Sequence, residues 1–241
     1  MMSDKHIVSG FDRDIMAIET FVAQIGAMAR DALEDATQAC LLRDKEIALR
    51  VQDGDRALDT LETQTRMAAI KLLALRAPSA VDLRFVLTVL EVCAHLERCG
   101  DYAKNIAKRS LALGPHGHFT GTDRALLRMS DAVNQMLADA LAAYLDRDTD
   151  KARAVIDADL ETDQRYNSLF RGLLTYMMED PRNITAGMHL HFVAKNLERI
   201  GDRATGIAEQ VIYLTTGEMP DDDRPKGDMT AQPQDGEQPT P

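Results

Sequence analysis

The 241-residue sequence contains no tryptophan, and aromatic residues make up only 5% of it. Long runs of Val, Ile or Thr at period two, which are typical of strands, are missing, and proline and glycine are sparse until the C-terminal end. The chain is instead rich in Ala, Leu, Met, Glu, Arg and Asp, most of which are compatible with helices. The composition therefore predicts an all-α protein.

Cysteine is also scarce, and its spacing is informative. Cys40, Cys93 and Cys99 form no CxxC pair, and an odd count without a disulfide framework favours reduced core thiols and a cytoplasmic protein. The N-terminal residues 1–13 lack the apolar core of a signal peptide. No stretch of about 18 or more apolar residues occurs, so we expect no direct membrane insertion. Any membrane association would then depend on a partner.

Positive charge is in deficit, and catalytic motifs are missing. The net charge is −11 with no basic stripe, which argues against nucleic-acid binding. Residues 217–241 carry −5 of that charge, so the rest of the chain is only mildly acidic. The sequence has no HExxH, Walker A, GxGxxG or GxSxG motif, and no Glu-x-x-His pair of the kind found in di-iron bundles. These absences predict a protein that is not an enzyme.

Apolar residues recur at steps of three and four along most of the chain, the pattern of amphipathic helices. Six long helices are predicted, at about 11–43, 45–76, 80–113, 122–146, 149–179 and 184–216. Ala77-Pro78-Ser79 ends the second helix, Gly54 is a candidate kink within it, and Thr122 or Asp123 is the expected N-cap of the fourth. Beyond Gly217, acids and prolines predict a disordered tail.

The helices form an internal repeat. Pro78 and Pro181 end corresponding helices, and the segment Leu96-Glu97-Arg98-Cys99-Gly100-Asp101 returns 101 residues later as Leu197-Glu198-Arg199-Ile200-Gly201-Asp202. Short connections between long helices imply antiparallel neighbours. We therefore predict two tandem, similar three-helix bundles at 1–113 and 123–216, a linker at 114–122 and a disordered acidic tail at 217–241.

The repeated segments carry paired carboxylates. Residues four apart lie one turn apart on the same side of a helix, so each Glu–Asp pair forms one small acidic surface. The second helix of each half contains a similar pair, which places four acids in each bundle. The candidate site residues are Asp55, Asp59, Glu97 and Asp101 in the first half and Asp159, Asp163, Glu198 and Asp202 in the second. Helix phase predicts that the acids of the third helices, Glu97 and Asp101 and likewise Glu198 and Asp202, lie at the edge of the buried stripe, on the bundle surface.

Two interpretations of these acids stay open. Clusters of oxygen ligands without thiolate favour hard cations such as Mg²⁺, Mn²⁺ or iron. Alternatively, the acids are solvated or paired with nearby Arg56, Arg98, Lys104 and Arg203. His189 and His191 point about 200° apart on one helix and cannot chelate together. His191 shares the face of Glu198, where we expect it to be solvated.

The chain resembles the PhoU family over roughly residues 5–216. The first half carries the resemblance in APSAVDLRFVLTVLEVCAHLERCGDYAKNIAKR. The second carries it in DADLETDQRYNSLFRGLLTYMMEDPRNI and NLERIGDRATGIAEQVIY. The duplicated E-R-x-G-D context in two three-helix halves is a highly specific feature.

This resemblance implies a cytoplasmic, often homodimeric regulator that restrains the phosphate-starvation response without catalysis. The implied partners are the cytoplasmic subunits of a phosphate ABC transporter and a phosphate-sensing histidine kinase. It also implies metal binding at the paired acids, all eight of which are present here. The alternatives are a metal-dependent enzyme or metal store that uses these acids, and a structural helical module in which they bind no metal.

Overall fold

The computed structural model describes residues 3–76, 80–114 and 118–220. Within these ranges the chain is helical and contains no strand, which confirms the predicted all-α fold with six long helices. The helices are α1 (Ser3–Leu42), α2 (Lys45–Arg76), α3 (Ala80–Leu113), α4 (Thr122–Asp146), α5 (Thr149–Glu179) and α6 (Ile184–Thr216). A short 3₁₀ turn, η1 (Pro181–Asn183), connects α5 to α6.

The helix bounds agree with the sequence prediction except at the start of α1. This helix begins at Ser3, whereas the apolar periodicity from which it was predicted begins near Phe11. Backbone hydrogen bonds need no apolar face, and no proline interrupts residues 3–10, so the helix extends beyond the part that the pattern can detect.

One local prediction was wrong. The N-cap of α4 is Gly121 (φ 83°), which makes no side-chain cap, while Thr122 is already helical. Glycine tolerates this left-handed conformation, so the turn itself fixes where the helix starts. The helix α2 continues unbroken through Gly54, and a kink at this exposed residue stays a prediction. By contrast, Asp148 caps α5 through hydrogen bonds from the amides of Asp150 and Lys151.

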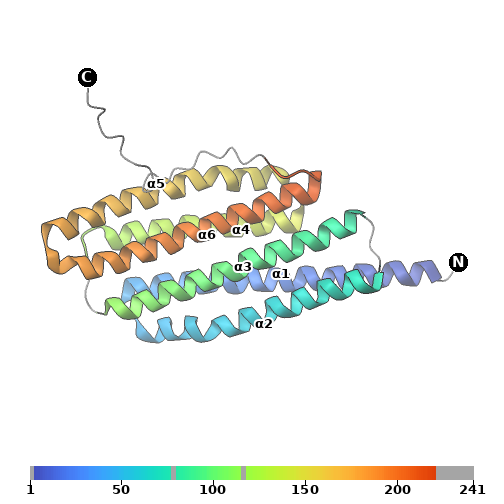
Figure 1. Cartoon of the computed structure of the whole chain (residues 1–241), viewed down its shortest axis with the longest axis horizontal. Coiled ribbons are helices and arrows are strands. Elements are labelled where there is room, and N and C mark those ends of the chain that lie inside the picture. Colours follow the sequence, from blue (N-terminus) through green and yellow to red (C-terminus); the bar gives the residue numbers. More distant parts are fainter. Residues whose placement is uncertain (1–2, 77–79, 115–117, 221–241) are drawn as a thin grey trace, which may run out of the picture.

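The six helices form two layers (Figure 1). One layer has the order α2, α3, α6, α5, and the other contains α1 and α4, which contact each other behind it. The helices α3 and α6 pack directly together, so they join the two three-helix halves. The end of α2 and the start of α3 lie at the opposite end of the molecule from the α5–α6 connection (Figure 1).

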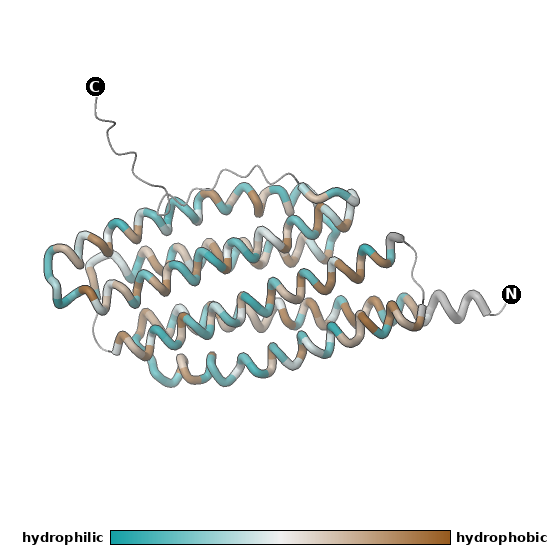
Figure 2. The backbone as a smooth tube through the Cα atoms, in the orientation of Figure 1, coloured by the Kyte–Doolittle hydropathy of each residue, from teal (hydrophilic) through white to brown (hydrophobic). Residues whose placement is uncertain are grey.

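A single apolar core runs through both halves. Apolar and hydrophilic residues alternate along each helix (Figure 2), so each helix buries one stripe and exposes the other. The core includes all three cysteines, as predicted, and burial raises the pKa of Cys40 to about 11 and those of Cys93 and Cys99 to about 12. At neutral pH these thiols are therefore protonated.

Some predictions concern residues outside the described ranges. These are the helix stop at Ala77-Pro78-Ser79, linker residues 115–117 and the acidic tail from residue 221 onward. Within the described part, Gly217 ends α6 with φ 87°. None of the described helices is long and apolar enough to span a bilayer.

Candidate functional site

The first acidic patch comprises Asp55 and Asp59 on α2 and Glu97 and Asp101 on α3. Asp55 is buried, with 6% of its surface exposed, and accepts a hydrogen bond from Lys104. Arg98 donates to Asp101 Oδ2 at 3.2 Å and lies 3.5 Å from Glu97 Oε2. The structure thus brings the two predicted acid pairs of the first half together around one ammonium and one guanidinium group.

The acids of the first patch act on one another electrostatically. Burial raises the pKa of Asp59, as do the charges of Asp55 and Asp101, against the opposing effect of Lys104. Burial likewise raises the pKa of Glu97, with further contributions from Asp101 and Asp59 and an opposing one from Arg98. The four side chains therefore form one cluster of negative charge.

Glu62 is a fifth acid of this cluster that sequence reasoning missed. Its charge raises the pKa values of both Asp59 and Glu97, and its carboxylate pairs with Arg66 at 2.5 Å. The signal was present in the sequence, since Glu62 follows Asp59 by three residues and so lies on the same helix face. A search limited to spacings of four residues does not find it.

A cavity of about 440 Å³ lies beside the first patch. It is bordered by Asp59 and Glu97 of the patch, by Glu62, and by Arg203 of α6. His95 also lines it, and burial together with the charge of Arg203 lowers the pKa of that imidazole to about 4. The first patch is therefore open to solvent on this side, and the α6 helix of the other half contributes to its border.

The second acidic patch comprises Asp159 and Asp163 on α5 and Glu198 and Asp202 on α6. Asp163 and Glu198 are buried, with 7% and 5% of their surfaces exposed. Lys195 donates to Glu198 Oε1 at 2.7 Å and lies 4.9 Å from the centre of the Tyr166 ring. The predicted position at the surface edge of the stripe was thus wrong for Glu198.

Burial dominates the electrostatics of the second patch. It raises the pKa of Glu198, which the hydrogen bond from Lys195 opposes and the charges of Asp202 and Asp163 reinforce. The second oxygen, Glu198 Oε2, is buried without a hydrogen-bond partner. Such an atom is costly to bury and marks a place where a further donor or a cation would be stabilising.

The glycine of each E-R-x-G-D segment explains how the acids on adjacent helices can approach. Both Gly100 and Gly201 are buried. A Cβ at Gly100 would lie 2.8 Å from Leu58 Cδ1, and one at Gly201 would lie 3.3 Å from Thr162 Cγ2 and 3.5 Å from Asp159 Oδ1. The absence of a side chain there lets the second and third helices of each half pack closely beside the carboxylates.

The histidine on the Glu198 face has a different environment from the one predicted. The His191 ring packs against Phe170 and Tyr166, with centroids 4.8 Å and 6.0 Å apart, so it is half-buried. Burial, reinforced by the charge of Lys195, lowers its pKa. His191 therefore belongs to the aromatic cover of the second patch.

The donor chemistry of both patches fits a hard cation, since it consists of carboxylate oxygens without thiolate. The buried, unpartnered Glu198 Oε2 and the mutual repulsion in the first patch agree with that chemistry. The side chains, however, are not arranged as a preformed metal site. Within the described ranges, no three His, Cys, Asp or Glu side chains are already gathered around one position that could hold a metal ion. Lys104, Arg98 and Lys195 supply the positive charge instead. The metal-ligand assignment remains a prediction.

Together, the fold and the patches define a class of protein. It is an all-helical protein of two repeated three-helix bundles, each with an acidic cluster between its second and third helices. The family model of the PhoU domain matches this chain twice, at residues 22–110 and 126–211. The chain belongs to the PhoU family.

Individual relatives agree over nearly the whole length. A phosphate-specific transport system accessory protein PhoU homolog from Caulobacter vibrioides is 43% identical, covering 95% of this chain and 99% of the relative. The Escherichia coli protein, named phosphate-specific transport system accessory protein PhoU, is 35% identical over 89% of each chain. The crystal structure of PhoU from Pseudomonas aeruginosa superposes with a TM-score of 0.83 at 32% identity, covering 86% of this chain and 100% of that one.

Proposed function

We propose that this protein is a cytoplasmic accessory protein of a phosphate-specific transport system. In this role it restrains phosphate uptake and the phosphate-starvation response by linking a phosphate ABC transporter to a sensor histidine kinase. The observation that carries the proposal is full-length similarity, in both repeats, to proteins named for that transport system. The joined α3 and α6 helices support it, because they combine the two bundles into one body that offers extended helix faces to partners.

The proposed role is non-catalytic, and binding is therefore the primary test. The tagged full-length protein is expected to retain the nucleotide-binding subunit of the phosphate transporter and the cytoplasmic part of the kinase in co-purification from its own host. Deletion of its gene is expected to raise phosphate-starvation reporter expression in phosphate-rich medium. Failure of both co-purifications, together with an unchanged reporter, would contradict the proposal. Light scattering on the purified protein tests the proposed homodimer.

A second proposal concerns the acids. We propose that the first patch binds a divalent cation or iron, held by Asp55, Asp59, Glu97 and Asp101, and that the second patch does so through Asp159, Asp163, Glu198 and Asp202. Binding at the first patch is expected to displace Lys104 from Asp55 and Arg98 from Asp101. The bound ion would supply positive charge that keeps α2 and α3 together.

The metal proposal is tested by elemental analysis and by titration with Mn²⁺. An Asp59→Asn/Asp101→Asn variant isolates the first patch, and an Asp163→Asn/Asp202→Asn variant isolates the second. Each variant is expected to lose the ions of its own patch while the other patch keeps them. Unaltered Mn²⁺ binding in both variants would place the ions elsewhere. Metal content of many ions per chain, or an activity lost in these variants, would instead support the alternative of a metal store or metal-dependent enzyme.

A further inference from the structure

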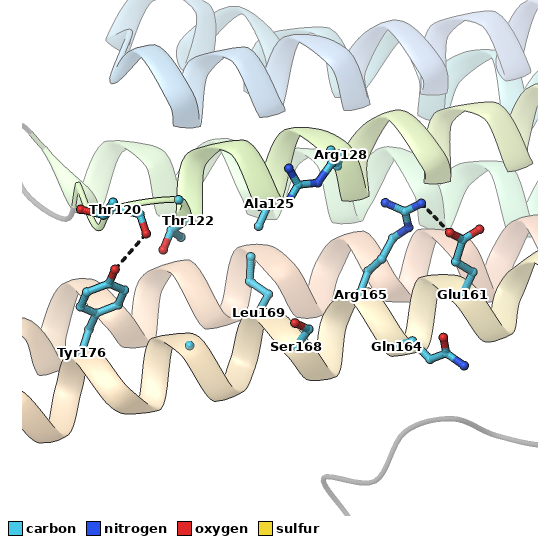
Figure 3. A pocket seen from close by; sticks show the side chains of 12 residues that line it. Thr120, Thr122, Ala125, Arg128, Glu161, Gln164, Arg165, Ser168, Leu169 and Tyr176 are labelled. Atoms are coloured by element: carbon cyan, nitrogen blue, oxygen red, sulfur yellow. Dashed lines mark hydrogen bonds and ion pairs between the residues drawn. The ribbon is translucent and has the colours of Figure 1, made fainter.

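A groove between α4 and α5 lies on the second half of the molecule (Figure 3). Its volume is about 510 Å³, within the range of about 300–1,000 Å³ that is typical of small-molecule sites. Arg128 of α4 and Arg165 of α5 border it from facing helices, and Ser168 adds a hydroxyl. Tyr176 closes one end, where its hydroxyl donates to the Thr120 carbonyl oxygen at 2.9 Å and its ring stacks on Phe119.

The charge of this groove is unusual for the protein. Two arginines and one acid, Glu161, line it, in a chain whose net charge is −11. In three other cavities of the described chain, acids outnumber arginines and lysines instead. One of these is the cavity beside the first acidic patch. The lining of the groove between α4 and α5 thus has a formal excess of one positive charge on an acidic protein.

Part of the hydrogen-bonding capacity of these arginines is unused. Arg165 donates to Glu161 through Nη2 at 2.7 Å, whereas its Nε is buried and has no hydrogen-bond partner. A buried guanidinium donor without an acceptor is destabilising unless an acceptor binds there. The start of α4 at Thr122 borders the same groove, and its N-cap, Gly121, makes no side-chain cap, so the helix dipole adds positive potential there.

Comparison of the repeats shows that the fold does not require this groove. Positions 104 residues earlier hold Gln24 for Arg128, Leu61 for Arg165 and Gln64 for Ser168. The helix also continues there, because α1 begins at Ser3, well before the residue that corresponds to the start of α4. The first half therefore forms the same three-helix bundle without the two guanidinium groups.

We propose that the groove between α4 and α5 binds a phosphoryl oxyanion, held by Arg128, Arg165 and Ser168. Guanidinium groups match the geometry of phosphoryl oxygens and form charge-assisted hydrogen bonds with them. The phosphoryl group can come from free inorganic phosphate or from a small phosphomonoester, and the groove is large enough for either. The proposal stands on the groove and does not depend on the proposed regulatory function.

Calorimetric titration of the purified full-length protein tests this proposal. Inorganic phosphate and glycerol 3-phosphate are titrated separately, each at an ionic strength matched with sodium chloride. Saturable binding of either probe supports the site, and the tighter of the two identifies the source of the phosphoryl group. Arg128→Gln/Arg165→Gln is expected to weaken that binding about tenfold or more, as for the loss of charge-assisted hydrogen bonds. Glu161→Gln frees Arg165 and is expected to tighten it severalfold.

Matched controls separate a built site from general charge effects. Arg153→Gln and Glu34→Gln change exposed residues that do not line the groove, and both are expected to leave the affinity unchanged within about twofold. Circular dichroism verifies folding, and the single variant Arg128→Gln, which alters an exposed side chain, replaces the double variant if that variant does not fold. Absence of saturable binding by both probes would overturn the proposal. Equal affinity of the wild-type and arginine variants would do so too.

Discussion

The two acidic patches share one motif but have different surroundings. Glu62 beside the first patch corresponds to Tyr166 beside the second, at a shift of 104 residues. On the third helices, Ala94 corresponds to Lys195, at a shift of 101 residues. The first pair borders an open cavity. In the second pair the lysine lies over the tyrosine ring and binds Glu198, which is buried, while Asp159 and Asp202 of the same patch stay partly exposed.

This comparison shows that the motif alone does not determine accessibility. Glu97 and Glu198 are equivalent residues, yet the side chain of the first is 28% exposed and that of the second 7%. The difference comes from residues outside the repeated segment. A small residue and an acid paired with Arg66 border the open side of the first patch, while an aromatic ring and a long amphipathic side chain lie beside Glu198 in the second.

The largest loss of stability is expected when the aromatic ring of Tyr166 is removed. Tyr166→Ala is expected to lower the free energy of unfolding by about 3–5 kcal/mol, because it leaves a cavity at a side chain that is only 2% exposed. The equivalent change in the first half, Glu62→Ala, is expected to cost only about 1 kcal/mol, since its partner Arg66 is 47% exposed although the Glu62 side chain is itself only 12% exposed. Urea unfolding followed by far-UV circular dichroism measures both. Similar losses of unfolding free energy in the two variants would contradict the inference that the two patches have different surroundings.

A smaller effect is expected from the buried ion pair of the second patch. Lys195→Met keeps an apolar stem over Tyr166 but leaves Glu198 without its cation. The expected loss is about 2 kcal/mol, less than for a fully buried pair, because the lysine side chain is still 27% exposed. Lys151→Met removes a comparable contact to the largely exposed Asp146 and is expected to change stability by below about 1 kcal/mol. Chemical unfolding of both variants in parallel compares their free energies of unfolding. Equal losses would argue against a buried ion pair between Lys195 and Glu198.

The smallest expected effect concerns pH. The pKa of Glu198 is raised above its ordinary value of 4.5, so the folded protein binds this proton more tightly than the unfolded chain does. Its contribution to stability is therefore fully present below pH 4.5 and is lost as the pH rises through the folded-state pKa. In Glu198→Gln, measured in the presence of a chelator, the free energy of unfolding should decline less over this window.

The equivalent residue of the first half provides the control. Glu97→Gln is expected to flatten the pH profile less than Glu198→Gln, because the Glu97 side chain is more exposed. Unfolding curves collected at several pH values above 4 measure both slopes. Identical profiles in the wild type and Glu198→Gln would show that burial does not affect the ionisation of this carboxyl group.

Local spacing was sufficient to predict much of the candidate site. The pairing of Asp55 with Asp59 and of Glu97 with Asp101 follows from helix geometry, because residues four apart share a face. The burial of Glu198 could not be predicted in this way, since it depends on how α6 packs against α5, where Lys195 lies over the Tyr166 ring. The environment of His191 could not be predicted for the same reason, because its ring packs against Phe170 of α5 and is half-buried. The N-cap of α4 depended on the left-handed turn at Gly121, which side-chain capping preferences did not reveal.

The sequence by itself determined the helical composition, the approximate limits of six helices and their division into two repeats. These features follow from contacts within about one helical turn and from residues that interrupt helices, which a linear pattern records directly. Only the tertiary structure decided that Glu97 stays partly exposed while Glu198 is buried, and that two arginines of different helices border one groove. Those properties depend on how helices are rotated and packed against one another, and the side chains that decide them lie far apart in the chain.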